Sequence, residues 1–115
     1  MSHRPAIRAR AALLRALAPH LGPHALLGKT SRDWASALFV GARHRLAIAL
    51  EGADALVRAE RLVRALGEAE LVMQGGFVAD LAVMTRVEGA EPVLAIEALT
   101  IEEAEEISCA ARRAG

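Results

Sequence analysis

Residues 77–99 read FVADLAVMTRVEGAEPVLAIEAL. Both ends of this stretch alternate between large apolar residues and polar or small ones, a period of two that predicts strands at Phe77–Val87 and Val93–Leu99. Between them, EGAEP places glycine and proline together, as turns do. The stretch therefore predicts two consecutive antiparallel strands, to which the rest of the fold is added.

Three more strand candidates lie upstream. Glu70–Gln74 is one, separated from Phe77 by two glycines. Trp34–Val40 and Arg45–Glu51 are the others, and residues 41–44, GARH, have the length and glycine content of a hairpin loop between them. The links between successive strands are short, which favours an antiparallel sheet.

Two helices are predicted from apolar spacing and end signals. The first runs from Arg4 to Ala18 and ends at Pro19. The second begins after Asp54 as N-cap and runs through Leu66, with Gly67 as its left-handed end residue.

A third helix is predicted at the C-terminus, where residues 100–103, TIEE, have the spacing of a capping box. Residues 19–33 are dense in proline, glycine and small polar residues, and we expect a surface connector there.

The order of these elements predicts a single α+β domain over residues 1–115, a two-layer sandwich in which an antiparallel sheet of about five strands carries helices on one face. Within it, residues 1–18 form a basic amphipathic helix, 19–33 the connector, and 34–115 the sheet with the central and C-terminal helices.

Alternation also divides the sheet into two faces. The side chains expected to point towards the helices are Leu46, Ile48, Leu50, Leu81, Val83, Val87, Leu94 and Ile96. The other face, the open face, then carries Arg45, Ala47, Ala49, Glu51, Asp80, Ala82, Met84, Arg86, Val93, Ala95 and Glu97. Alanines mixed with acids and arginines are unusual for a freely solvated face, so something is expected to cover it.

A homodimer is the first interpretation of this cover, because alanines allow close approach of a second copy. The alternative is a shallow pocket in which arginines bind a small anionic ligand. The candidate binding residues, including those of the adjoining hairpin, are Arg43, His44, Arg45, Asp80, Arg86 and Glu97.

Catalysis is the weaker interpretation. An enzyme would use this cluster with His44, whose type titrates near neutral pH. No nucleophile and base pair stands out, and Cys109 is interpreted as a packing residue. His20 and His24 have helical metal-ligand spacing, but Gly22 and Pro23 separate them, so we expect neither metal nor cofactor.

Charge is balanced overall, with 14 Lys+Arg against 14 Asp+Glu, yet it is segregated. Residues 1–32 contain six basic side chains and no acidic one. We expect this basic segment to dock on the acidic C-terminal helix. Nucleic-acid binding is the alternative and a membrane surface the least favoured, since only three aromatic residues are available for stacking or anchoring. Arg10 falls within the apolar stripe of the first helix and is expected to reach solvent or a carboxylate.

The single cysteine excludes disulfide frameworks and zinc fingers and favours a reducing, cytoplasmic location. One lysine against thirteen arginines, with abundant alanine, is typical of a GC-rich bacterial genome. No apolar run is long enough to span a membrane.

Overall fold

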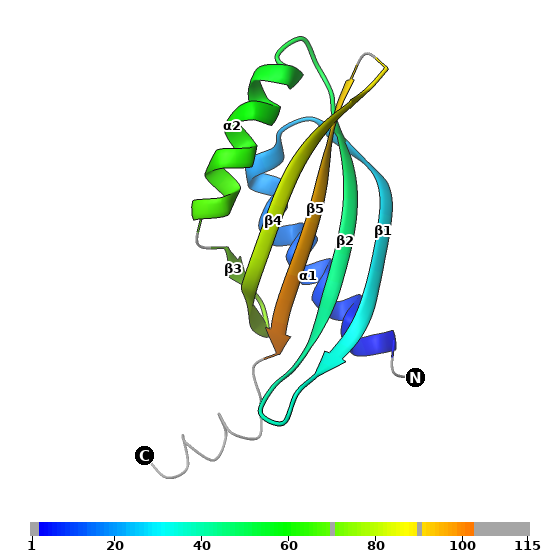
Figure 1. The fold of residues 1–115 in the computed structure, drawn as a ribbon, viewed down its shortest axis with the longest axis vertical. Helices are drawn as coiled ribbons and strands as arrows, with labels where there is room; N and C mark the ends of the chain where they lie inside the picture. Colours follow the sequence, from blue (N-terminus) through cyan, green and yellow to red (C-terminus); the bar gives the residue numbers. More distant parts are fainter. Residues whose placement is uncertain (1–2, 70, 90, 103–115) are drawn as a thin grey trace.

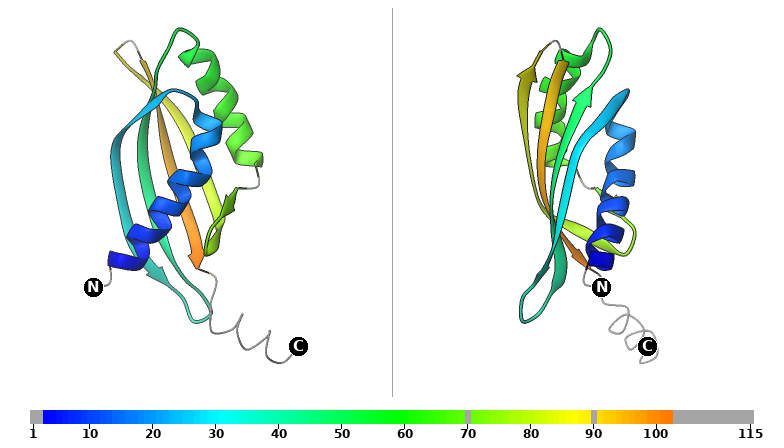
Figure 2. Two further views of the ribbon diagram at one scale, coloured as in Figure 1. Left: turned by 180° about the vertical axis from the view of Figure 1, so that it is seen from behind. Right: turned by 90° about the vertical axis from the view of Figure 1, so that its right-hand side faces the viewer.

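An antiparallel sheet with two helices on one of its faces makes up the part of the chain that the computed structural model describes, residues 3–69, 71–89 and 91–102. Figure 1 shows the sheet from its open face, with both helices behind it or beside it, and Figure 2 shows the same two layers from behind and from the side. The elements are α1 His3–Leu21, β1 His24–Ala35, β2 Val40–Leu50, α2 Ala55–Glu68, β3 Val72–Met73, β4 Gly76–Glu88 and β5 Glu91–Glu102. The predicted α+β two-layer fold is confirmed.

The strand order is β1-β2-β5-β4-β3, and all neighbours are antiparallel. Hairpins join β1 to β2 and β4 to β5. Strand β2 also pairs with β5, although the two strands lie far apart in the chain. Helix α2 lies between the two hairpins in sequence and packs against β4 and β5, while α1 packs against β1 and β2.

The core lies between the helices and the sheet. Its fully buried side chains include Leu13 and Leu17 of α1, Leu66 of α2, and Ile48 and Leu94 of the sheet. Burying each such side chain contributes roughly 1.5–3 kcal/mol, so this layer carries most of the stability. The predicted helix-facing set is confirmed except for Val87, which lies near the β4–β5 turn and is 64% exposed.

The predicted connector at 19–33 is wrong. Most of it is strand β1, which begins at His24, and the hairpin turn lies at residues 36–39 and not at 41–44. A strand on the edge of a sheet needs no strict apolar alternation, because one side of its backbone and part of its side chains remain in solvent. Glycine and polar residues are therefore tolerated in β1.

Both described helices run past their predicted ends. Helix α1 continues through Pro19 to Leu21, whose burial in the core compensates for the hydrogen bond that the proline removes. Helix α2 continues through Gly67 to Glu68, and Gly67 is not left-handed. At its start, Asp54 occupies the N-cap position without a side-chain capping bond.

The capping box predicted at residues 100–103 is also wrong, because residues 100–102 lie in β5 and the Thr100 hydroxyl bonds to His44. The remainder of the predicted C-terminal helix, and with it Cys109 and the acidic docking surface, lies outside the described residues. Among the helices of the described segments, none is long and apolar enough to cross a bilayer.

Candidate functional site

Four of the six predicted site residues meet on the open face. In the register of the sheet Arg45 lies opposite Glu97, and Arg43 and Asp80 lie on either side of Leu99. These side chains line a shallow hollow of about 440 Å³ that crosses four strands. Parity along the strands predicted that Arg45, Asp80 and Glu97 share a face, whereas their proximity follows from the order of the strands.

One ion pair is formed within the hollow. Arg45 Nε lies 3.3 Å from Glu97 Oε1, and the two side chains are 77% and 62% exposed. An ion pair this exposed contributes at most about 1 kcal/mol, but it partly neutralises Arg45.

A fifth charged group that the sequence interpretation missed lies on the edge strand. Arg32 of β1 is the direct cross-strand partner of Arg43, and Thr30 is the partner of Arg45. All of these side chains are exposed on the same face. The only signal for Arg32 was the two-residue period through Thr30, Arg32 and Trp34, which the glycines and prolines upstream concealed.

Arg86 does not join the hollow. It lies opposite Val93, four residues along β4 from Ala82, which is roughly 13 Å at the rise of a strand. Beside it, Val93 and its partner Ala49 are buried, so this end of the predicted open face is less exposed than alternation suggested.

His44 adjoins the hollow, but its ring lies beneath the sheet. The residue is in β2, between the helix-facing Ala42 and Leu46, and only 1% of its surface is exposed. Its Nδ1 is 2.8 Å from Ser31 Oγ and its Nε2 is 2.9 Å from Thr100 Oγ1. The ring therefore cannot act on a ligand that lies against the open face.

Hydrogen-bond partners indicate the tautomer of this ring, and its surroundings set its charge. Thr100 donates its hydroxyl proton to the Ala42 carbonyl at 3.4 Å, so Thr100 Oγ1 accepts from His44 Nε2–H. Nδ1 is then free to accept from the Ser31 hydroxyl, while Ser31 Oγ accepts from Arg10 Nη1 at 3.5 Å. Burial, and secondarily the positive charge of Arg10, lowers the pKa of His44 from 6.5 to about 4. His44 is thus a neutral structural residue at physiological pH.

Within the described residues Arg10 forms no ion pair with a carboxylate, and it stays partly exposed to solvent. Its side chain is half-buried between α1 and β1, and its hydrogen bond goes to the Ser31 hydroxyl. A guanidinium in the apolar stripe of α1 is accommodated because the polar chain Ser31, His44 and Thr100 lies directly beneath it.

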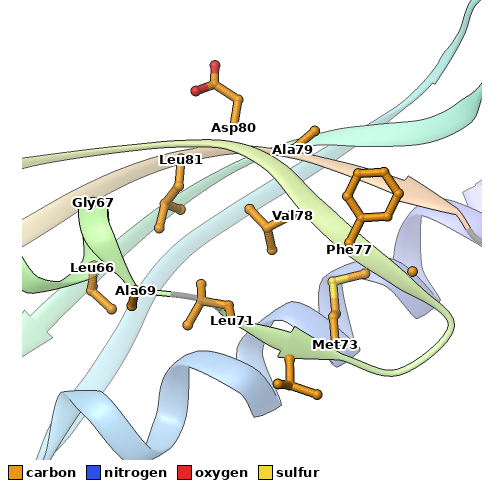
Figure 3. A pocket seen from close by; sticks show the side chains of 12 residues that line it. Leu66, Gly67, Ala69, Leu71, Met73, Phe77, Val78, Ala79, Asp80 and Leu81 are labelled. Carbon is orange, nitrogen blue, oxygen red and sulfur yellow. The ribbon is translucent and has the colours of Figure 1, made fainter.

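A second depression lies on the other side of the sheet, below β4. Figure 3 shows Leu66, Leu71, Val78 and Leu81 directed towards it, whereas Asp80 points away. Its volume is about 670 Å³, and it is bordered by the end of α2, by β3 and by the first half of β4. We call this depression the apolar cleft.

A comparison of this chain with protein-family models, with curated proteins and with solved structures found no match. Within the described residues, no group of three or more His, Cys, Asp or Glu side chains is arranged as a metal site.

Proposed function

We propose that this chain is a homo-oligomeric, cytoplasmic binding protein whose open sheet face holds a small anionic ligand between Arg32 and Arg43. The cytoplasmic assignment is supported by the single cysteine, Cys109. The ligand class is a small molecule that carries a phosphate or carboxylate group.

The observation that carries the proposal is the direct opposition of Arg32 and Arg43 across β1 and β2. Like charges directly opposite one another destabilise a sheet. In the described part of the chain the two ion pairs are Arg45–Glu97 and Arg58–Asp54, so neither arginine of the opposed pair has a carboxylate partner there. An anion bound between the two guanidinium groups would remove the repulsion.

The side chains around the hollow further restrict the class of ligand that fits it. Two guanidinium groups can each donate two parallel N–H bonds to a phosphate or carboxylate, and the Thr30 hydroxyl adds another donor nearby. The opposite wall carries Asp80 and Glu97, which repel a second anionic group. The ligand therefore has one anionic end over β1 and β2 and a hydrogen-bond donor or ammonium end towards β4 and β5.

The test is anion binding measured by isothermal calorimetry and thermal shift, with inorganic phosphate as the first probe and an amino acid as the carboxylate probe. Arg32→Ala and Arg43→Ala should each weaken binding by about tenfold or more, whereas Arg45→Ala should weaken it less, because Glu97 already engages that side chain. Arg61→Ala, which removes an exposed arginine from α2, is the matched control.

One result of this experiment would contradict the proposed site. If Arg32→Ala and Arg61→Ala reduce the thermal shift equally, the effect reflects net charge and no site lies between Arg32 and Arg43. Chloride at the same ionic strength separates screening from binding in the same experiment.

A further inference from the structure

The outer edge of β4 is unpaired over most of its length. Strand β3 pairs with β4 only at Gly76 and Phe77, and no other described strand lies on that side. In Figure 1, β4 forms the margin of the sheet above β3. The backbone N–H and C=O groups that point outwards along this edge are free to pair with another strand.

The two edges of the sheet differ in how they are protected. Strand β1 carries Lys29 and a register shift between Leu26 and Gly28, both of which discourage strand addition. The edge of β4 over Asp80–Glu88 contains neither lysine nor proline, and its register shift lies before Asp80. β4 is therefore the edge suited to pairing.

The charges on this edge are self-complementary. When two copies of an antiparallel strand pair about a two-fold axis, the numbers of opposed residues have a constant sum, and the sum is even because opposed residues share a face. An axis at Val83 places Asp80 of each copy opposite Arg86 of the other. Moving the axis to Met84 would place Asp80 opposite Glu88, and moving it to Ala82 would place it opposite Met84, so of these three registers only the one at Val83 pairs Asp80 with Arg86.

The same register also covers apolar surface. Asp80 and Arg86 are both exposed and, within the described residues, belong to no ion pair. Val87, which follows Arg86, is 64% exposed. In the dimer it would lie beyond Asp80 of the other copy, at the opening of that copy's apolar cleft and near its Leu71 and Leu81. Figure 3 shows these two leucines directed into the cleft below β4 and Asp80 on the opposite side of the strand.

We propose that two copies of this chain pair antiparallel along Asp80–Arg86 of β4, with the two-fold axis at Val83, and so join their sheets into one. This inference rests on the self-association in the proposed function and supplies its surface. It needs neither Arg32 nor Arg43, although it engages Asp80, which also lines the hollow. The open faces of both copies stay accessible in this dimer, because Arg32 lies three strands and Arg43 two strands away from β4.

The experiment is light scattering after size exclusion over a range of protein concentrations, with circular dichroism to verify folding. Wild type should be a dimer. Asp80→Arg and Arg86→Asp should each raise the dissociation constant by about tenfold or more, because each places like charges opposite one another twice. The double variant D80R/R86D should restore the dimer, since the exchanged charges are again complementary.

Ala47→Arg is the control, because it places a charge on the open face in β2, two strands from the edge, and should leave the dimer intact. Three outcomes would overturn the inference: a wild type that is monomeric at every concentration, a dimer that the single reversals do not weaken, or a double variant that fails to recover. A dimer broken by Ala47→Arg alone would keep self-association and place it on the open face.

Discussion

At the scale of single residues, His44 links the free energy of unfolding to pH. Its pKa is about 4 in the folded chain and 6.5 when unfolded, so between these values the unfolded chain binds more protons. The contribution of His44 to the free energy of unfolding, on the order of 3 kcal/mol, is therefore fully present above about pH 6.5. It is lost as the pH falls towards 4. Denaturant unfolding at several pH values should show this decline.

The exposed His24 provides the matched control for that titration. His24→Gln should retain the slope between pH 6.5 and 4, and His44→Gln should flatten it. A slope that survives in His44→Gln would assign the effect to other groups. Asp54 acts at lower pH, because the hydrogen bond from Arg58 lowers its pKa below the ordinary 3.8, and its contribution is lost as pH falls below that value.

At the scale of elements, the close approach of two strands requires a glycine at position 41, whereas the glycine at position 67 in α2 can be replaced. A Cβ at Gly41 would overlap the backbone carbonyl oxygen of Thr100 in β5, whereas a Cβ at Gly67 in α2 would meet open space. Gly41→Ala should lower the free energy of unfolding by roughly 3 kcal/mol or more, and Gly67→Ala should raise it by about 0.5–1 kcal/mol. Urea unfolding measures both, and similar values for the two variants would contradict the close approach.

The elements that sequence patterns predicted best were those with a buried face. Alternation placed β4 and β5 within a few residues of their observed bounds, because their helix-facing positions must be apolar. It failed for the edge strand β1, whose composition reflects solvent on one side. It also failed at Thr100, where the Thr and Glu spacing of a capping box occurs inside a strand.

At the scale of the whole molecule, the layers could be predicted but the strand order could not. Pairing of β2 with β5 joins segments separated by about 50 residues, and no local pattern encodes such a contact. For the same reason, the sequence predicted only some of the residues of the candidate site. Arg45, Asp80 and Glu97 followed from parity, and Arg43 was named only as a residue of the predicted hairpin loop. Arg32 required knowledge that β1 lies beside β2, and the ring of His44 required the true hairpin position.

Arg58 of α2 connects three other segments of the chain, namely the end of α1, the start of β1 and the end of β2. It extends from the first turns of α2 and donates to the carbonyls of Leu21 and Pro23, at 3.2 and 2.7 Å, and to that of Glu51 at 2.8 Å. It thereby binds the C-terminal end of α1, the entry to β1 and the exit from β2, and its positive charge lies at the negative end of the α1 dipole. Its fourth partner is Asp54 Oδ1, at 2.7 Å.

Arg58→Ala should therefore lower the free energy of unfolding of the whole chain by about 2–3 kcal/mol, since three carbonyls would lose a charged donor. Arg58→Lys should recover only part of this loss, because an ammonium lacks the planar fork that reaches several carbonyls at once. Arg61→Ala, one turn along the exposed side of α2, is the control and should change stability little. The pKa of Asp54, followed by NMR titration, should rise in Arg58→Ala and stay low in Arg61→Ala, because the hydrogen bond from Arg58 is the largest cause of its depression. Equal stability of Arg58→Ala and Arg61→Ala, with an unchanged Asp54 titration, would show that this junction is held by its backbone and core contacts alone.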